Sequence, residues 1–363
     1  MIKSAYIHIP FCNRICSYCD FCKVLYNKKY INDYLESLEK EINYLYNKDI
    51  LDTIYIGGGT PSSLSIIELE TLFNILRTFK KSKNCEITIE ANIESLTIEK
   101  LKLFKKYGVN RLSIGLESTN EKHLKYLNRN INFKRVEELI NTAYNLGIDN
   151  INIDLMYGIK SQSISDIKKD IDFVTKLGVK HISIYSLIIE ENTKLFIDKT
   201  TCIDEEIEAN MYQYICNYLK ELGYNHYEIS NFSKDGYESR HNLCYWSNCN
   251  YYGFGVGASS YIDNIRESNN RSLTKYLNNE FEKNTEILTK DDIMDYEVML
   301  RLRLKDGIDK KIFKSKYHKN IEEIYSYQEL VDNNLLIEDS NKLYIKEDKL
   351  FISNEIIIHI EKR

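Results

Sequence analysis

Apolar and polar positions alternate between two periods from the start of the chain to about Leu187. Short β-branched runs predict strands, and between them apolar residues recur at helical spacing. The predicted strands are Ala5–Ile9, Thr53–Ile56, Glu86–Ile89, Arg111–Ile114, Asn150–Leu155 and His181–Ser186. The predicted helices are Tyr30–Tyr46, Ser65–Phe79, Thr97–Tyr107, Phe133–Leu146 and Ser163–Leu177. Six strands joined by helical crossovers predict an α/β fold with a parallel sheet, which can be open or curled like a barrel.

The pattern changes after Leu187. A further amphipathic helix is expected at Glu205–Leu222 and a short strand at His226–Ile229, followed by a stretch rich in glycine and aromatic residues. From about Lys290 the pattern predicts three helices, two short strands and a last helix, an order typical of a winged-helix-like module. We therefore expect three parts, at residues 1–200, 201–289 and 290–363.

A dense group of cysteines follows the first predicted strand, in a loop at residues 10–22 that one of only two prolines enters. Cys12, Cys16 and Cys19 have C-x3-C-x2-C spacing, and Cys22 follows. A mononuclear tetrahedral site normally takes four side chains, so three thiols suggest a centre with one open position. An iron–sulfur cluster held by three cysteines has that property.

Polar or backbone-exposing residues also end the other strands, where parallel α/β folds place their ligands. Gly57–Gly59 follow the second strand, and Glu90, Glu117 and Asp154 end later ones. Each has an ordinary alternative: a tight turn for the glycines, and capping of the next turn for Glu90 and Asp154. Their common edge favours a shared ligand.

The ligand that fits this edge carries an amino acid head, a ribose and an adenine. Its amino and carboxylate groups can chelate an open iron, while glycine carbonyls take the ammonium group and carboxylates hold the ribose hydroxyls. Arg129, which alone would be a surface charge, can pair with the carboxylate. S-adenosylmethionine has these groups.

The cysteine motif, with Tyr18 before its last cysteine, resembles the signature of the radical S-adenosylmethionine superfamily. Further segments resemble the oxygen-independent coproporphyrinogen III oxidase-like family: Tyr6-Ile-His-Ile-Pro-Phe-Cys, Ile56-Gly-Gly-Gly-Thr-Pro, Ile87-Thr-Ile-Glu-Ala-Asn, Arg111-Leu-Ser-Ile-Gly and Asn152-Ile-Asp-Leu-Met-Tyr-Gly. Arg240-His-Asn-Leu-Cys-Tyr-Trp and Gly253-Phe-Gly-Val-Gly-Ala resemble its heme chaperone branch. The resemblance covers essentially the whole chain.

This resemblance implies a partial (β/α)6 TIM-like barrel that carries a [4Fe-4S] cluster, with a mostly helical C-terminal domain. It places Cys12, Cys16 and Cys19 at the cluster. The residues it places at S-adenosylmethionine are Tyr6, Tyr18, Gly58, Gly59, Thr60, Glu90, Glu117, Arg129 and Asp154. The cofactor would supply a 5′-deoxyadenosyl radical after reductive cleavage, with an electron donor such as flavodoxin or ferredoxin.

The chain departs from the family pattern in three places. Gly115-Leu-Glu-Ser stands where Gly-Val-Gln-Ser is usual, so Glu117 keeps an acceptor, adds a charge and loses a donor. Gly158-Ile-Lys-Ser-Gln replaces Gly-Leu-Pro-Gly-Gln, and Glu190-Glu-Asn-Thr replaces Glu-Pro-Asn-Thr. The last two are loop changes of a divergent member.

Two residues bear on the branch. The porphyrinogen oxidases have a cysteine two positions after the third thiol, where this chain has Phe21, and Cys22 is interpreted as a nearby free cysteine. His241 is a candidate heme ligand, with Tyr245 and Trp246 packing on the macrocycle. The alternative is a buried histidine that holds the linker by hydrogen bonds.

Composition limits the partners. The chain has 363 residues, a formal net charge of −5 and no long basic run, so nucleic acid is not expected. The nine cysteines are too few for a disulfide scaffold in a chain of this length, and an odd number cannot all pair. They therefore indicate a protein of a reducing compartment. With neither a secretory pattern nor a bilayer-length apolar stretch, we expect a cytoplasmic protein. Membrane contact through an acceptor, and the oligomeric state, stay open.

The sequence therefore predicts a radical S-adenosylmethionine heme chaperone, which binds heme as cargo and transfers it to an acceptor hemoprotein. The alternative is an oxygen-independent coproporphyrinogen III dehydrogenase, which decarboxylates propionates oxidatively. A third reading is a degenerate barrel that binds its cofactors weakly and acts only through partners. Phe21 and the His241 segment favour the first.

Overall fold

Six parallel strands form the centre of a curved sheet in the computed structural model, which describes residues 1–363. They lie in the order β1-β4-β5-β6-β7-β8, and each neighbouring pair is parallel. Their bounds are Ser4–Ile9, Ile50–Gly58, Lys80–Asn92, Arg111–Glu117, Asn150–Tyr157 and His181–Ser186. All six predicted strands are confirmed, and the parallel sheet with them.

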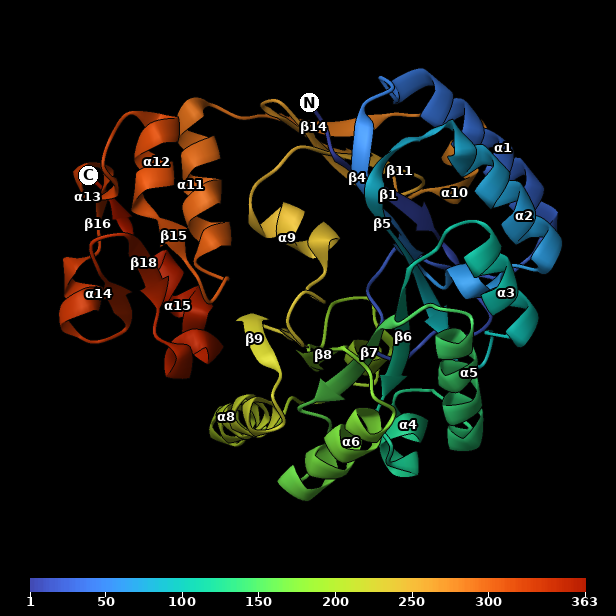
Figure 1. Ribbon diagram of the computed structural model, residues 1–363, viewed down its shortest axis with the longest axis horizontal. Coiled ribbons are helices and arrows are strands. Elements are labelled where there is room, and N and C mark those ends of the chain that lie inside the picture. Colours follow the sequence, from blue (N-terminus) through green and yellow to red (C-terminus); the bar gives the residue numbers. More distant parts are fainter. The chain divides into compact units, whose positions relative to one another are not determined.

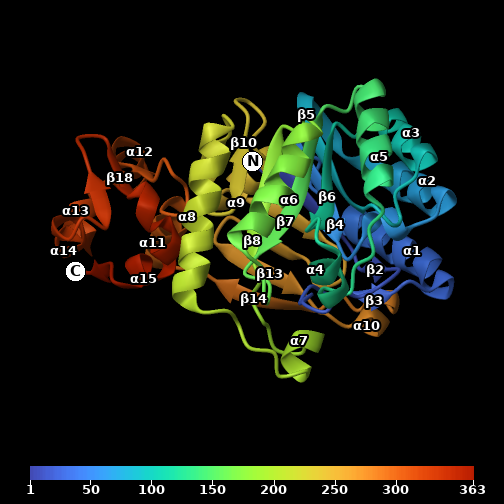
Figure 2. The ribbon, with the colours of Figure 1, turned by 90° about the horizontal axis from the view of Figure 1, so that it is seen from below.

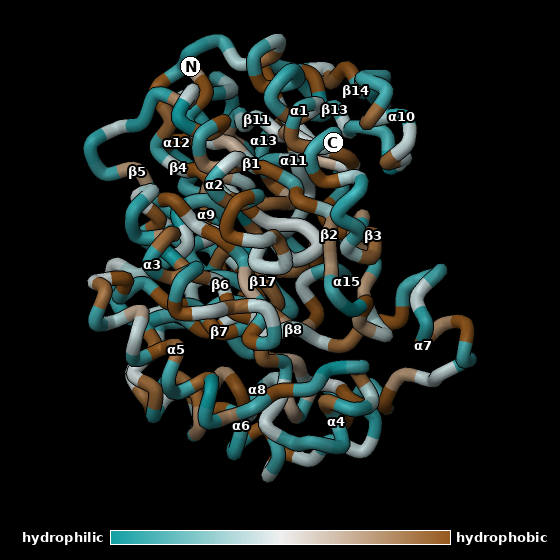
Figure 3. The backbone as a smooth tube through the Cα atoms, turned by 90° about the vertical axis from the view of Figure 1, so that its right-hand side faces the viewer, coloured by the Kyte–Doolittle hydropathy of each residue, from teal (hydrophilic) through white to brown (hydrophobic).

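The predicted crossover helices are also confirmed: α1 (Lys28–Leu45), α2 (Ile66–Ile75), α3 (Ile98–Lys106), α5 (Phe133–Asn145) and α6 (Ile164–Lys176). Figures 1 and 2 show them along the outer face of the curved row of strands. In Figure 3 the tubes of α5 and α6 alternate between teal and brown, as expected of helices with one buried face. Together these elements form the (β/α)6 partial barrel.

Local signals set where several helices begin. Ser65 starts α2 and Ser163 starts α6, each with a capping box in which the serine and the third helical residue satisfy each other's backbone N–H groups. Short elements between the main ones were not predicted: α4 (Glu121–Tyr126), α7 (Lys194–Ile197), and the 3-10 turns η1 (Pro61–Ser63) and η2 (Leu76–Thr78). Because η2 follows directly, α2 ends at Ile75, before the end of the predicted helix at Phe79.

The glycine- and aromatic-rich stretch extends the sheet. β11 (Tyr251–Phe254) pairs in parallel with β1, and β12 (Ser259–Ile262), β13 (Ile265–Asn269) and β14 (Lys283–Ile287) continue antiparallel. α10 (Leu273–Leu277) lies between the last two in the chain. Gly253 is required in β11, because a β-carbon there would lie 1.9 Å from the Ser259 carbonyl oxygen. Sequence patterning missed β11 because Gly253 interrupts its alternation.

The chain divides into two compact units. The first comprises Met1–Met211 with Asn250–Ile287, and the second comprises Tyr212–Cys249 with Leu288–Arg363. α8 (Glu205–Glu221) runs from one into the other along the chain. The expected three-part division stays a prediction.

The second unit is mostly helical, with short strands. Its helices after α8 are α9 (Arg240–Trp246), α11 (Lys290–Arg301), α12 (Lys310–Tyr317), α13 (Ile321–Ile324), α14 (Gln328–Asp332), η3 (Glu347–Ile352) and α15 (Ser353–Ile358). Its strands are β9 (Asn225–Glu228), β10 (Asn231–Ser233), β15 (Ile308–Asp309), β16 (Tyr325–Ser326), β17 (Leu336–Glu338), β18 (Lys342–Ile345) and β19 (Glu361–Lys362). β17 and β18 are the two expected short strands before the last helix, and they pair antiparallel. No helix of the chain has the length and apolar character needed to cross a bilayer.

Candidate functional site

The cysteine loop leaves the carboxyl end of β1 and is held by backbone contacts. β2 (Phe11–Cys12) pairs with β3 (Val24–Leu25), which brings the two ends of the loop together. The Ser17 amide donates to the Leu127 carbonyl at 3.2 Å, and the Ser17 hydroxyl donates to the Tyr126 carbonyl at 2.8 Å. The loop is thus fixed on the C-terminal end of α4.

The three thiols of the motif have different surroundings. Cys12 is buried, and the Thr60 hydroxyl lies 3.5 Å from its sulfur. Cys16 is half-buried, with Arg129 Nη1 4.0 Å from its sulfur, and Cys19 is half-buried beside Lys23, which bonds to its carbonyl. No three His, Cys, Asp or Glu side chains converge as ligands of one metal ion.

Glycines after β4 let the backbone pass close to the cysteine loop. A β-carbon at Gly59 would lie 2.6 Å from the Pro10 carbonyl oxygen and 2.9 Å from the Cys12 sulfur. Gly58 has φ +117°, and a β-carbon there would lie 2.8 Å from the His8 ring. These positions admit only glycine, so the triple glycine does more than make a tight turn.

Two of the predicted carboxylates, Glu90 on β5 and Asp154 on β7, are half-buried and lie on the two strands that flank β6. Glu90 accepts from the Gly58 amide at 3.0 Å and from the Tyr55 hydroxyl at 2.8 Å. Asp154 accepts from Asn152 at 2.7 Å and from Ser113 at 3.3 Å. Burial raises the pKa of Glu90 to about 7 and also raises the pKa of Asp154. The edge therefore favours a ligand that offers hydrogen-bond donors or positive charge.

Glu117 and Arg129 meet at the same edge. Glu117 stands at a register shift in β6 with φ 61°, and it accepts from Arg129 Nη1 at 3.0 Å and from the Tyr18 hydroxyl at 2.9 Å. Its second oxygen, Oε2, is buried without a partner. Burial raises the pKa of Glu117 to about 7. Tyr18 in turn packs against an apolar cluster that includes Leu127 and Met156, which anchors the loop.

Tyr6, the remaining predicted contact, lies on β1. Its hydroxyl is 3.0 Å from His8 Nδ1, and its ring stacks on Tyr55 with centroids 6.1 Å apart. Burial raises its pKa, as does the nearby Glu90 carboxylate. The Tyr6 hydroxyl therefore stays un-ionised, and its side chain lines the site next to Glu90.

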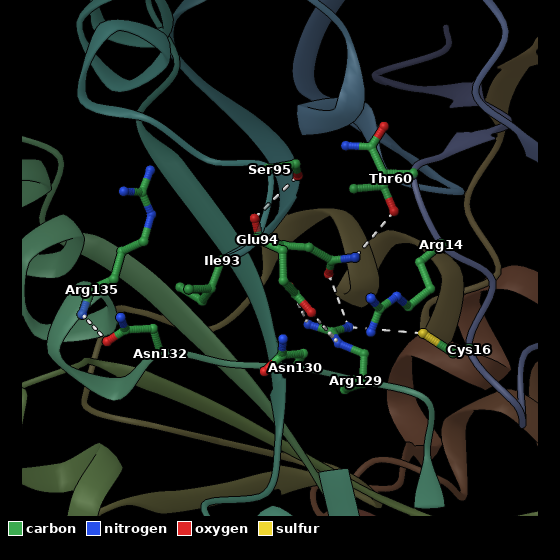
Figure 4. A pocket seen from close by; sticks show the side chains of 12 residues that line it. Arg14, Cys16, Thr60, Ile93, Glu94, Ser95, Arg129, Asn130, Asn132 and Arg135 are labelled. Carbon is green, nitrogen blue, oxygen red and sulfur yellow. Dashed lines mark hydrogen bonds and ion pairs between the residues drawn. The ribbon is translucent and has the colours of Figure 1, made fainter. Parts of the chain in front are cut away.

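A cavity of about 380 Å³ adjoins these residues and is lined by Cys16, Thr60, Arg129 and several polar groups. Figure 4 shows Glu94, Arg129 and Cys16 turned toward one another, with Arg135 at the other end. Sequence reasoning missed Glu94, which binds Arg129 Nε and Nη2 at 3.1 Å each. It also missed Asn92, which donates to Thr60 and accepts from Arg129. Their position just after the third predicted strand could have indicated that they lie at this edge of the sheet.

These features fit S-adenosylmethionine and a cluster. The ligand is cationic at its sulfonium and ammonium groups. The edge carries the buried Glu117, whose Oε2 has no partner, and the half-buried Glu90 and Asp154. Glycines without β-carbons expose main chain beside the thiols. Thiolates are the ligands that iron–sulfur clusters take.

Comparisons with known proteins identify the family of this chain. A family model of the Radical SAM superfamily matches residues 6–174, and one of the HemN C-terminal domain matches residues 288–348. The heme chaperone HemW of Lactococcus lactis subsp. lactis (strain IL1403) is 37% identical over 98% of this chain and 96% of its own length. This chain belongs to the HemW family of radical SAM proteins. HemW of Bacillus subtilis (strain 168) is 36% identical and covers 98% of both chains.

A solved structure, the coproporphyrinogen III oxidase HemN of Escherichia coli, described as a radical SAM enzyme, matches with a TM-score of 0.86. It is 20% identical and covers 98% of this chain and 89% of its own. At that identity the match shows the fold alone, and the expected radical SAM fold is thereby confirmed. Membership of the radical SAM superfamily implies an iron–sulfur cluster and S-adenosylmethionine.

Two further predicted residues lie as follows. Cys22 is half-buried, its sulfur 3.6 Å from the Arg271 carbonyl and its carbonyl 2.7 Å from His8 Nε2. His241, on α9 of the second unit, is buried, and its Nε2 lies 2.8 Å from the Tyr245 hydroxyl. In this structure His241 is thus buried and hydrogen-bonded, as expected for the alternative in which it has a structural role.

Proposed function

We propose that this HemW family protein binds heme and transfers it to acceptor hemoproteins, carrying a [4Fe-4S] cluster and S-adenosylmethionine. The observation that supports it most is identity of 36–37% over nearly the full length to proteins named heme chaperone HemW. Phe21, where the porphyrinogen oxidases have a fourth cysteine, supports the same choice.

The cluster would be held by Cys12, Cys16 and Cys19. Thr60 and Arg129 lie against the first two sulfurs, where a hydroxyl and a guanidinium stabilise thiolate charge. When bound, the cluster and S-adenosylmethionine supply one-electron chemistry at the sulfonium. An electron donor such as flavodoxin or ferredoxin would reduce the cluster.

The chain's own groups would orient S-adenosylmethionine. Gly58, Gly59 and Thr60 present main chain next to the thiols, and Glu90 faces that segment. Arg129 would receive the carboxylate, while Glu117 and Asp154 accept from ribose hydroxyls. Tyr6 and Tyr18 close the edge against water.

Heme would bind at the α9 segment, with His241 as the iron ligand and Tyr245 and Trp246 against the macrocycle. His241 Nε2 is hydrogen-bonded to the Tyr245 hydroxyl, and this bond would have to open if that nitrogen were to hold the iron. A buried, hydrogen-bonded histidine that must exchange its partner suits cargo that is held and then released. The acceptor, any membrane contact through it, and a cytoplasmic location remain parts of this proposal.

The experiment is transfer of heme from the anaerobically reconstituted protein to an apo-hemoprotein, followed by absorption. We expect stoichiometric heme uptake, then transfer, with uptake lost in His241→Ala and kept in His359→Ala, a matched change of an exposed histidine. If His241→Ala binds heme as the unchanged protein does, the ligand assignment is wrong. If neither protein binds heme, the proposed function itself fails.

A further inference from the structure

Two cysteines at the end of α9 are brought together by the way this helix terminates. The Asn248 amide donates to the Tyr245 carbonyl at 3.0 Å, and the Cys249 amide donates to the Cys244 carbonyl at 3.0 Å. Asn248 has φ 50°, the left-handed conformation that ends a helix in the Schellman motif. In that motif the side chains at the positions of Cys244 and Cys249 contact each other, usually as an apolar pair.

The backbone geometry is compatible with a disulfide between these two residues. With a 3.0 Å hydrogen bond joining them, standard backbone dimensions keep the two Cα atoms within roughly 7 Å, the outer limit for a disulfide. In keeping with this backbone contact, a side-chain hydrogen bond with Cys244 lowers the pKa of Cys249. The remaining requirement is access, and Cys249 is exposed while Cys244 is half-buried.

The charges around Cys249 favour its thiolate. The contact with Cys244 lowers its pKa first, and Arg301 and Lys316 lower it further, to about 6, against burial and Glu297, which raise it. Glu297 is itself engaged by Lys316 and by the Tyr317 hydroxyl at 2.6 Å. An exposed cysteine beside two cations and a second thiol is the setting of reactive cysteines.

We propose that Cys244 and Cys249 form a thiol–disulfide exchange site that reacts with low-molecular-weight disulfides. The Cys249 thiolate attacks one sulfur of the disulfide, forms a mixed disulfide and releases one thiolate. The Cys244 sulfur then attacks the Cys249 sulfur, its proton leaves, and the second thiolate departs. Two cysteine thiols are oxidised, one disulfide is reduced to two thiols, and the two protons end on them.

This site differs from the chain's other thiols. Cys85 and Cys216 are buried, and burial raises the pKa of Cys216 to about 12. Cys202 is exposed but occupies no helix end that would bring a second cysteine to it. The proposal goes beyond heme delivery and stands whether or not heme binds to α9.

Oxidation of Cys244 and Cys249 can be followed through the fluorescence of Trp246. This residue is the only tryptophan of the chain and lies between the two cysteines in the sequence. A disulfide formed next to it is expected to quench its emission. Trypsin, which cleaves after Lys and Arg, also releases both cysteines in one peptide, His241–Arg266, which contains no other cysteine.

The test uses the full-length protein without oxygen, in reduced and oxidised glutathione at graded ratios. Remaining thiols are blocked with N-ethylmaleimide, the protein is digested with trypsin, and the mass of the peptide His241–Arg266 is measured by mass spectrometry. We expect an internal disulfide, lighter by two hydrogens than the unblocked peptide, to exceed the glutathione adduct about tenfold, with Trp246 emission falling in parallel. Cys244→Ser should instead accumulate the glutathione adduct at Cys249, and Cys202→Ser should behave as the unchanged protein.

The proposal is overturned if both cysteines are recovered as N-ethylmaleimide adducts in the most oxidising buffer. It is equally overturned if the unchanged protein accumulates the glutathione adduct as Cys244→Ser does, because Cys244 would then not resolve it. Cys202 and Cys216 share another tryptic peptide, Thr200–Lys220, and are expected to remain reduced in the same samples. Comparable oxidation there would show that reaction is not specific to the α9 end.

Discussion

Glu117 and Arg129 form an ion pair 3.0 Å long in which the side chains are only 7% and 3% exposed. Glu94 holds the other side of the same guanidinium through two contacts of 3.1 Å. Arg129 is therefore fixed next to Cys16 by two carboxylates, and its position depends on both. A buried charge that loses its partner is costly, so each of these residues affects stability as well as ligand binding.

The first prediction concerns Glu117. Glu117→Ala should lower the free energy of unfolding by about 3 kcal/mol, because Arg129 and the Tyr18 hydroxyl both lose a buried partner. Glu117→Gln should lower it by only about 1 kcal/mol, because an amide oxygen still accepts from both. Urea unfolding of the two variants measures this. Equal losses would mean that the carboxylate oxygen is not what holds Arg129.

The second prediction concerns the thiols. Cys12→Ala, Cys16→Ala and Cys19→Ala should each lose most of the iron and visible absorption of the reconstituted protein, since each removes one proposed ligand. Cys22→Ala should retain both, because its sulfur contacts the Arg271 carbonyl, and the buried Cys85→Ala is a further control. Iron content per chain under anaerobic conditions is the measurement. Unchanged iron in the first three would refute the cluster assignment.

The third prediction concerns Gly59. Gly59→Ala should reduce iron incorporation at least several-fold, because the added methyl group would displace Pro10 or the Cys12 sulfur. Gly236→Ala is the matched control: its surroundings are open, so it should cost about 1 kcal/mol for its left-handed φ of +80° and leave iron unchanged. Iron loss in both would indicate general unfolding.

The fourth prediction concerns Glu228 in the second unit. Burial raises its pKa to about 7, above its value in the unfolded chain. Its protonated form therefore stabilises the fold at low pH, and this stabilisation is lost as pH rises through about 7. Between pH 5 and pH 8 the free energy of unfolding of the unchanged protein should fall by roughly 2 kcal/mol more than that of Glu228→Gln. Urea unfolding at both values tests this, and parallel pH profiles for the two proteins would contradict it.

The sequence predicted the parallel strands and their crossovers, because β-branched runs alternate with segments of helical period, some of which begin at a cap such as Ser65 or Ser163. It also predicted that Glu90, Glu117 and the cysteine loop share one edge, since parallel strands end on the same side. The identities of these residues as ligand contacts came from family resemblance and remain predictions.

Other features were beyond sequence reasoning for physical reasons. The pairing of β11 with β1 joins segments more than two hundred residues apart, and Gly253 weakens its strand pattern. The bidentate contact of Glu94 with Arg129 depends on the path of the chain after β5, which no periodicity encodes. Likewise, the contact of Cys244 with Cys249 follows from the left-handed Asn248 that ends α9.

The most direct test of the proposed function presents heme and coproporphyrinogen III side by side to the anaerobically reconstituted protein with S-adenosylmethionine and a reductant. We predict that one equivalent of heme is taken up and can be passed to an apo-hemoprotein, while coproporphyrinogen III is not converted. Formation of protoporphyrinogen over many turnovers, without stoichiometric heme uptake, would contradict the assignment and favour the dehydrogenase.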